Sequence, residues 1–399
     1  MANEINPPRG MRDFLPAEKG NREQVLAIIR GVYESFGFQE VETPALENLD
    51  RLTSGQGGDN EKLAFRVMKR GADLESALIS GGDADALSDL GLRFDLTVPL
   101  TRFYASNRSA LTNVFKAIQI GPVWRAERPQ KGRYRQFVQC DIDIIGDESN
   151  LAEIELINAS LATLDALGLG ESIVRVNHRS LLVSLLSGFG VTEDKLSEAM
   201  IIIDKLDKIE VAGVLAELED KLGGQVASNA KTWFATLDAS KIPDVLTNIF
   251  SAVDGNRLRF DPTLVRGMGY YTGAIFEIEH PSSGLSIGGG GRYDGMVGKW
   301  LGTDVPAVGI SLGFERVVEL VPETKLSKGV VLVLEDYSTE TIKAATSYQR
   351  ELIGQGMNVR LEIKPKRLNL LLETMKANGF ESFAIVSGDG LKPALKPID

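Results

Sequence analysis

The chain has 399 residues, 43% of them apolar and 25% charged, which is typical of globular proteins large enough for two or three domains. Its 55 acidic residues outnumber 44 basic ones, and the formal net charge of -11 argues against bulk electrostatic attraction to nucleic acid or anionic lipid. The N-terminal segment lacks the apolar core of a signal peptide, and no later stretch approaches the roughly 18 apolar residues of a membrane span. We therefore expect a soluble, cytoplasmic protein without membrane contact.

Cysteine and histidine are too scarce for several kinds of site. The single cysteine, Cys140, excludes an internal disulfide. With only His178 and His280 beside it, a Cys/His zinc site has too few ligands. Any metal must therefore be held by carboxylates or by the substrate itself.

The first predicted element is an amphipathic helix over residues 18–36. Its apolar side chains recur at the spacing of one helical face, and Gly37 supplies the stop. The extended segment 38–47 follows it. A helix followed by an extended strand therefore begins the fold.

Residues 115–146 predict a long antiparallel hairpin. Apolar and polar residues alternate on both sides of the Pro-Gln-Lys-Gly sequence at 129–132, where proline and glycine favour a turn. Arg125 and Glu127 on one arm can project from the same face as Arg133 and Arg135 on the other. The hairpin therefore gathers charged side chains on one ribbon.

The positive charges of this turn leave two interpretations open. Arg128, Lys131, Arg133 and Arg135 lie within one short segment of an acidic chain, and such cations repel one another unless an anion lies among them. A solvated charge run is the simpler interpretation. The flanking apolar strands fix the ribbon, which favours a phosphate site.

Changes in pattern along the chain predict its domains. Residues 171–250 are rich in Leu, Ala, Lys and Glu, which indicates helices, and strand patterns return afterwards. Strands separated by helices near the C-terminus indicate a small α/β domain. The expected parts are a first sheet-based part at 1–170, a helical insertion at 171–250, a second sheet-based part at 251–325 and the α/β domain at 328–399.

Two further segments have alternative interpretations. The glycines at 288–291 would let a ligand approach the backbone, but no Gly-Lys-Ser/Thr follows, and a strand packed tightly against a neighbour explains them equally well. Arg316 is expected near the start of a helix, where backbone N–H groups favour anions, or else as an ordinary surface residue.

Several polar residues stand in apolar surroundings. We place Asp95 in a mainly apolar strand, where a carboxylate is costly unless it faces a cation or ligand. Tyr270 and Tyr271 are expected on an extended segment, pointing to opposite sides, with one lining a pocket or with both in the core. Arg266 is either part of a site or a salt-bridge partner.

Taken in order, these segments resemble the histidyl-tRNA synthetases, a family of class II aminoacyl-tRNA synthetases. Residues 10–47 resemble motif 1, the dimer-forming element, and "VWRAERPQKGRYRQF" resembles motif 2. "AVGISLGFERV" resembles motif 3, and "LVRGMGYYTGAIFE" resembles the histidine-specific signature. The resemblance covers nearly all of residues 7–321 and implies an α+β fold, in which an antiparallel-sheet catalytic domain carries a helical insertion and precedes a small C-terminal α/β domain.

The resemblance also implies roles for individual residues. Arg125 would contact the α-phosphate of ATP and the substrate carboxylate, Glu127 the adenine end, and Arg133 the terminal phosphate. Arg316 matches the motif 3 arginine, and Arg266 the signature arginine at the α-phosphate. The residues that match the histidine pocket are Asp95, Thr97, Gln139, Asp143, Tyr270 and Tyr271.

The implied reaction is the ATP-dependent activation of histidine to histidyl-adenylate, followed by transfer to tRNA(His) by a homodimeric enzyme. ATP would be a substrate, with Mg²⁺ accompanying its phosphates and no metal site formed by the protein. The alternative is the regulatory paralogue of histidine biosynthesis, which keeps the fold but activates an ATP phosphoribosyltransferase. The arginines and the C-terminal domain favour the enzyme.

Two features depart from the family pattern. The signature more often has Asp where this chain has Gly269. The C-terminal domain, which resembles the anticodon-binding domain, is short. The departures concern the local geometry of the pocket and the contacts with the anticodon.

Overall fold

The computed structural model describes residues 5–53, 63–130, 132–266, 270–322 and 329–398. Two compact units are present, one formed by Met1–Arg12 with Ile28–Val321 and the other by Asp13–Ala27 with Pro322–Asp399. The boundary between Ala27 and Ile28 falls inside helix α1 (Pro16–Ser35), which matches the predicted amphipathic helix. In the described ranges, no helix combines the length and the apolar character needed to cross a membrane.

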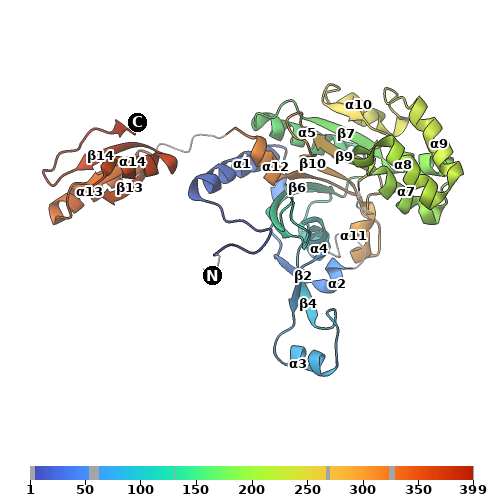
Figure 1. Ribbon diagram of the computed structural model, residues 1–399, viewed down its shortest axis with the longest axis horizontal. Coiled ribbons are helices and arrows are strands. Elements are labelled where there is room, and N and C mark those ends of the chain that lie inside the picture. The colour runs from blue at the N-terminus through green and yellow to red at the C-terminus, as the bar shows by residue number, and fades with distance from the viewer. Residues whose placement is uncertain (1–4, 54–62, 131, 267–269, 323–328, 399) are drawn as a thin grey trace. The chain divides into compact units, whose positions relative to one another are not determined.

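The larger unit is built around one mainly antiparallel sheet, which within the described residues has eight strands (Figure 1). In spatial order these are β1 (Gln39–Glu40), β5 (Phe115–Trp124), β6 (Gln136–Ile145), β11 (Ala307–Gly313), β10 (Gly288–Arg292), β9 (Ala274–Glu279), β7 (Ile173–His178) and β8 (Leu258–Phe260). The inner strands pair antiparallel, and the edge strands β1 and β8 pair parallel with their neighbours. The predicted antiparallel sheet is confirmed.

The two faces of this sheet differ in chemistry because side chains alternate along each strand. One face is apolar and buried and includes Cys140, Ile142, Ile144, Val308, Ile310, Leu312, Phe276 and Ile278. Helix α5 (Leu151–Ala166) covers it, since Glu153 of that helix pairs with Arg292 of β10 at 2.6 Å. The opposite face carries polar, charged and glycine residues, namely Gln139, Asp141, Asp143, Ser311, Gly309, Gly289, Glu277 and Arg175.

The predicted hairpin is confirmed. Strands β5 and β6 pair from Phe115 with Ile145 to Trp124 with Gln136. The turn is closed by Gln130 and Arg133, and a positive φ of 74° at Gly132 explains the need for glycine there. Lys131 of the predicted basic turn lies outside the described residues, as does Gly269.

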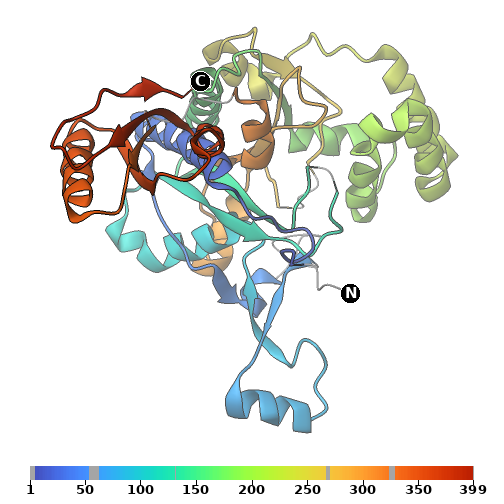
Figure 2. The same ribbon diagram turned by 60° about the vertical axis from the view of Figure 1, so that its left-hand side comes forward.

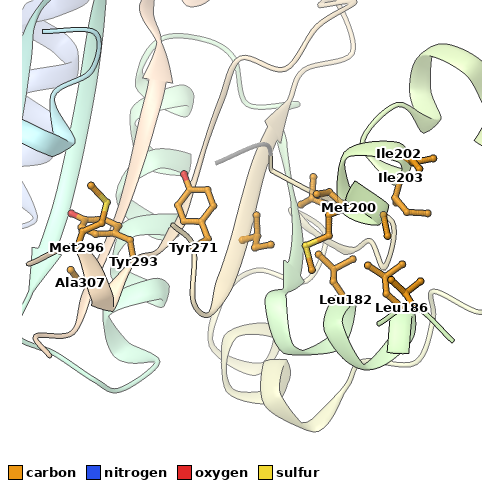
Figure 3. Packing of buried hydrophobic residues seen from close by; sticks show 14 of the residues in the cluster. Leu182, Leu186, Met200, Ile202, Ile203, Tyr271, Tyr293, Met296 and Ala307 are labelled. Atoms are coloured by element: carbon orange, nitrogen blue, oxygen red, sulfur yellow. The ribbon is translucent and has the colours of Figure 1, made fainter. Parts of the chain in front are cut away.

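The helical segment follows strand β7 and begins at Arg179, later than the predicted residue 171, because residues 173–178 pair with β9 in the main sheet. Its helices are α6 (Arg179–Gly188), α7 (Leu196–Ile203), α8 (Leu206–Leu222), α9 (Gly224–Thr236) and α10 (Thr247–Ala252). Figure 3 shows Leu182 and Leu186 of α6 beside Met200 of α7. These side chains belong to the same buried cluster as Tyr271 and Tyr293, which joins the helices to the core of the sheet.

A second, smaller sheet forms an arm of the larger unit. It contains β2 (Leu46–Asn48), β4 (Ser88–Leu92) and β3 (Arg66–Met68), with helix α3 (Gly71–Ile79) at its outer end (Figure 2). Helices α2 (Leu49–Leu52), α4 (Thr97–Asn107), α11 (Asp294–Leu301) and α12 (Phe314–Leu320) complete the unit. Helix α4 begins just after β4 and packs against α11.

The C-terminal part of the smaller unit is an α/β fold, as predicted. Parallel strands β12 (Gly329–Leu334), β13 (Asn358–Ile363) and β14 (Phe380–Val386) alternate with helices α13 (Thr339–Gly354) and α14 (Leu368–Ala377). The short strand β15 (Lys396–Pro397) pairs antiparallel with β14. A buried strand β12 with helices packed against it explains why the sequence reads as alternating strands and helices.

The glycines of β10 are explained by close packing. A Cβ atom at Gly290 would lie 1.9 Å from the carbonyl oxygen of Gly309, and one at Gly289 would lie 2.8 Å from Cζ of Arg266. The backbone of β11 and the side chain of Arg266 occupy the space that a side chain would need. The glycines therefore let β10 pack tightly against β11, and they also let the side chain of Arg266 approach the backbone of β10.

Gly290→Ala is expected to destabilise the larger unit by about 1–3 kcal/mol or more, because the added methyl group meets backbone that cannot rotate away. Gly295→Ala is the control, since its Cβ would meet nothing within 4 Å and it lies in helix α11, where alanine is favoured over glycine. Thermal unfolding of both variants checks this expectation. Equal midpoints for Gly290→Ala and the wild type would show that β10 and β11 are not packed so closely.

Candidate active site

A cavity of about 1400 Å³ lies over the polar face of the main sheet. Its walls come from β6, β9, β10 and β11, from the β5–β6 turn and from the segments that precede α4 and β9. The structure brings together every residue predicted for the site, because this cavity is lined by Asp95, Thr97, Arg125, Glu127, Arg133, Gln139, Asp143, Arg266, Tyr270, Tyr271 and Arg316.

Three buried carboxylates form the acidic part of the cavity. Asp95, Asp141 and Asp143 have at most 4% of their surface exposed. Asp143 accepts a hydrogen bond from the hydroxyl of Tyr293 at 2.5 Å, and Asp141 is 3.4 Å from the amide nitrogen of Gln139. Among the described residues, Oδ2 of Asp95 has no hydrogen-bond partner. A buried acceptor without a partner is costly, so this group favours a ligand that donates hydrogen bonds.

Burial weakens the acidity of these carboxyl groups. Desolvation raises the pKa of Asp143 to about 7, against the lowering effect of the Tyr293 hydrogen bond and with a further increase from Asp95. Desolvation and the neighbouring Asp143 raise the pKa of Asp141 well above its ordinary value. The pKa of Asp95 is also raised by burial, although Val98 and Arg125 counteract part of the shift. Like charges brought together in a dry site predict a cationic partner.

The position predicted for Asp95 was wrong. Strand β4 ends at Leu92, and Asp95 lies in the turn before α4, where Oδ1 accepts a hydrogen bond from the backbone N–H of Val98 at 3.1 Å. Aspartate favours such helix starts because its oxygen satisfies a backbone donor that has no partner inside the helix. The remaining oxygen stays available to the cavity.

The expectation that Tyr270 and Tyr271 point to opposite sides was also wrong. Their rings pack edge to face with centroids 4.9 Å apart, and both line the cavity. Tyr270 also contacts the ring of Tyr293, with centroids 6.3 Å apart. Tyr270 lies in a turn, so the alternation of an extended strand does not apply. The three rings form an aromatic wall beside the carboxylates.

Arginines form the basic part of the cavity. Arg125 donates from Nε to the carbonyl oxygen of Phe94 at 2.9 Å, which holds its guanidinium near Asp95. Arg133 lies 3.4 Å from Glu127 across the β5–β6 turn. Desolvation lowers the pKa of Arg316, and the positive charges of Arg133 and Arg266 lower it further. Cations that repel one another across an open space predict an anionic ligand between them.

The segment that carries Arg266 is held against strand β7. Asp261 pairs with Arg175 of β7, with Nε and Oδ2 2.6 Å apart, and it also accepts hydrogen bonds from Thr263. The amide of Asn177 donates to the carbonyl oxygen of Leu264 at 3.0 Å. Arg266 itself forms an ion pair with Glu277 of β9 at 2.9 Å, so the salt-bridge interpretation of Arg266 is confirmed alongside its place in the cavity.

Several residues that line the cavity were not predicted from the sequence. Asp141 lies between Gln139 and Asp143 on the same face of β6, and the alternation of that strand could have identified it. Tyr293 and Glu277 contact predicted site residues across strands, and no local pattern indicates such pairing. Glu315, next to Arg316, accepts from the backbone N–H of Val138 at 3.1 Å and so fixes the end of α12 to β6.

The cavity can therefore hold ligands that carry both cationic or N–H groups and anionic groups. Buried carboxylates suit an amine or an imidazole N–H, and the arginines suit phosphate oxygens. Among the residues that the structure describes, no group of three or more His, Cys, Asp or Glu side chains is arranged to hold a metal ion. The charges that the chain itself supplies to a phosphate group are those of arginine.

Asp143→Asn should stabilise the ligand-free protein, and the effect should depend on pH. The raised pKa means that folding disfavours the ionised carboxylate of Asp143. The resulting loss of folding stability is complete above pH 7, decreases as the pH falls and is absent below about pH 4. At about 1.4 kcal/mol for each pKa unit, Asp143→Asn should raise the free energy of unfolding at pH 8 by roughly 1–4 kcal/mol. Thermal unfolding at pH 8 and pH 4.5 measures it.

The control for this experiment is Asp89→Asn, which changes an exposed aspartate of β4. It should leave the unfolding midpoint nearly unchanged at both values of pH. A gain for Asp143→Asn that stays constant between them would show that ionisation of this group is not the cause.

Comparison with known proteins identifies the family of the chain. The family model described as histidyl-tRNA synthetase matches residues 10–317. The histidine–tRNA ligase of Leifsonia xyli subsp. xyli is 52% identical, with 100% of this chain and 99% of the relative covered, and that of Aeropyrum pernix is 37% identical, with 90% and 84% covered. The crystal structure of histidyl-tRNA synthetase from Nostoc sp. has a TM-score of 0.77 and 26% identity, with 99% of this chain and 95% of that one covered. The chain belongs to the histidyl-tRNA synthetase family.

Proposed function

We propose that this protein activates histidine with ATP, giving histidyl-adenylate and pyrophosphate, and then transfers the histidyl group to tRNA(His). The observation that carries the proposal is one cavity with buried carboxylates in one part and arginines in another. Histidine has cationic and N–H groups for the first part, and ATP has phosphates for the second. The carboxylate of histidine would then meet the α-phosphate where the two parts adjoin, near Arg125.

In this proposal the histidine pocket consists of Asp95, Thr97, Gln139, Asp143, Tyr270 and Tyr271, to which we add Asp141. Oδ2 of Asp95 and Oε1 of Gln139, which have no hydrogen-bond partner in the described part of the chain, would accept hydrogen bonds from the amine and the imidazole. A substrate lacking these donors would leave buried acceptors unpaired, which is a strong basis for selecting one amino acid. The tyrosine rings would exclude water from one side.

The ATP site would consist of Arg125, Glu127, Arg133, Arg266 and Arg316. A carboxylate oxygen of histidine attacks the α-phosphorus, a new O–P bond forms, and the bond to pyrophosphate breaks. Negative charge builds up on the phosphoryl oxygens, and the fixed guanidinium groups of Arg125 and Arg266 would stabilise it. Mg²⁺ would enter with ATP and balance the charge of its phosphates.

Transfer requires further partners. The 3′-terminal ribose hydroxyl of tRNA would attack the carbonyl carbon of the adenylate, and AMP would leave. The smaller unit presents exposed Lys366 and Arg367 just before α14, where they can meet the phosphate backbone of tRNA.

We further propose a homodimer that works in the cytoplasm. The segment that includes α1 and β1 matches the family's dimer-forming motif.

The regulatory alternative finds no specific support. Proteins of that kind lose the cationic groups that bind ATP, whereas Arg125, Arg133, Arg266 and Arg316 line one cavity here. We therefore retain the charging enzyme as the single proposed function.

Arg266→Ala should abolish most adenylate formation while histidine binding persists, because the positive charge beside the α-phosphate is lost and the carboxylate pocket is unchanged. A rate loss of about 10²–10³-fold in histidine-dependent ATP–pyrophosphate exchange is expected from removal of one such group. Arg108→Ala, which changes an exposed arginine after α4, is the control. Exchange at the wild-type rate in Arg266→Ala would remove Arg266 from the chemistry.

A double variant, Lys366→Gln with Arg367→Gln, should weaken tRNA charging and leave pyrophosphate exchange intact. Loss of two phosphate contacts lowers the affinity for tRNA and makes charging less sensitive to salt. Lys376→Gln, at the other end of α14, is the control. Unchanged charging at both low and moderate salt would exclude these residues from the tRNA site.

A further inference from the structure

We propose that Glu277 is a positioning residue that fixes the guanidinium of Arg266 for the activation step. This inference rests on the proposed function, because it assumes that Arg266 acts at the α-phosphate of ATP. Glu277 lies on β9 with 17% of its side chain exposed, and it uses one carboxylate oxygen for each of two arginines. Its Oε2 accepts from Nη1 of Arg266 at 2.9 Å, and its Oε1 accepts from Nη1 of Arg175 at 3.0 Å.

The space around Arg266 is shaped to hold it in one place. Gly289 of β10 lies directly opposite Glu277, and a Cβ there would be 2.8 Å from Cζ of Arg266. The guanidinium therefore lies against a strand that has no side chain at that position, with Glu277 beside it. Burial opposes ionisation of Arg266, but Tyr271 and Glu277 outweigh it, so its pKa is raised and the group stays charged.

Arg175 holds Glu277 in turn. It is buried on β7, donates from Nε to Asp261 and donates from Nη1 to both Glu277 and Glu279. Asp261 also accepts hydrogen bonds from Thr263, and so belongs to the segment that leads to Arg266. The same guanidinium thus anchors both the backbone that carries Arg266 and the carboxylate that orients its side chain.

Such support matters because a free arginine side chain has about 2 kcal/mol of rotamer entropy to lose when it is fixed. Arg316 also places positive charge near Arg266 and would push it away in the absence of ATP. Glu277 occupies only Nη1 among the donors of Arg266. The other N–H groups of Arg266 form no hydrogen bond with the described residues and would meet the phosphate, and a donor that is already aimed costs no reorganisation during the reaction.

Glu277→Gln tests the inference in histidine-dependent pyrophosphate exchange. Glutamine keeps the length and one acceptor but loses the charge and the second anionic oxygen. We expect kcat to fall about 10–100-fold with little change in the KM for histidine, because the histidine pocket does not include Glu277. Glu279→Gln is the matched control, since Glu279 lies on the same strand and contacts Arg175 and Arg259, and among the described residues it forms no hydrogen bond or ion pair with Arg266. It should remain near the wild-type rate.

A second variant, Glu277→Asp, keeps the negative charge but shortens the side chain by one methylene group, which withdraws the carboxylate from both Arg266 and Arg175. It should also lower kcat, and it covers the case in which Glu277→Gln fails to fold. Thermal unfolding of each variant confirms that folded enzyme is compared.

The decisive measurement places Glu277→Gln in the Arg266→Ala background. If Glu277 acts only through Arg266, the double variant is as slow as Arg266→Ala alone. A further 10-fold loss in the double variant, or wild-type exchange in folded Glu277→Gln, would overturn the inference. Wild-type exchange in Arg266→Ala would instead overturn the proposed role of Arg266, so the two failures are distinguishable.

Discussion

The antiparallel register of β6, β11, β10 and β9 puts Asp141, Asp143 and Glu277, with Gly289 and Gly309, on one face of the sheet and mainly apolar side chains on the other. The site depends on this division. The apolar face packs against α5 and supplies the stability that allows the other face to bury Asp95, Asp141 and Asp143 near one another. Glycines at 289 and 309 leave room above the strands, since a Cβ at Gly309 would lie 1.9 Å from Oδ1 of Asp143.

Like charges repel one another in the ligand-free cavity, and ligands of opposite charge can relieve this repulsion. Carboxylates with raised pKa values stand in one part, and mutually repelling arginines in another. Histidine and ATP would each bring the opposite charge to its part of the cavity and bring their reacting atoms together between them. The ligand-free protein therefore carries a cost in stability at the place where it gains binding and rate, which is a usual compromise at functional sites.

The sequence predicted much of this because the relevant signals are local. The β5–β6 hairpin follows from alternating side chains and a Pro-Gly turn, and the C-terminal α/β fold follows from apolar strands between helices. Asp95 was misplaced because the apolar residues around it look like a strand, whereas the aspartate starts a helix. The pair of Glu277 and Arg266 could not be predicted, since it depends on how the segment after β8 lies across β9 and β10.

The most direct test of this account is histidine-dependent exchange of labelled pyrophosphate into ATP, measured in parallel with each of the other amino acids. It reports adenylate formation without tRNA, and so examines the cavity by itself. The account predicts rapid exchange with histidine and background exchange with the others. No exchange with histidine, or equal exchange with another amino acid, would contradict it.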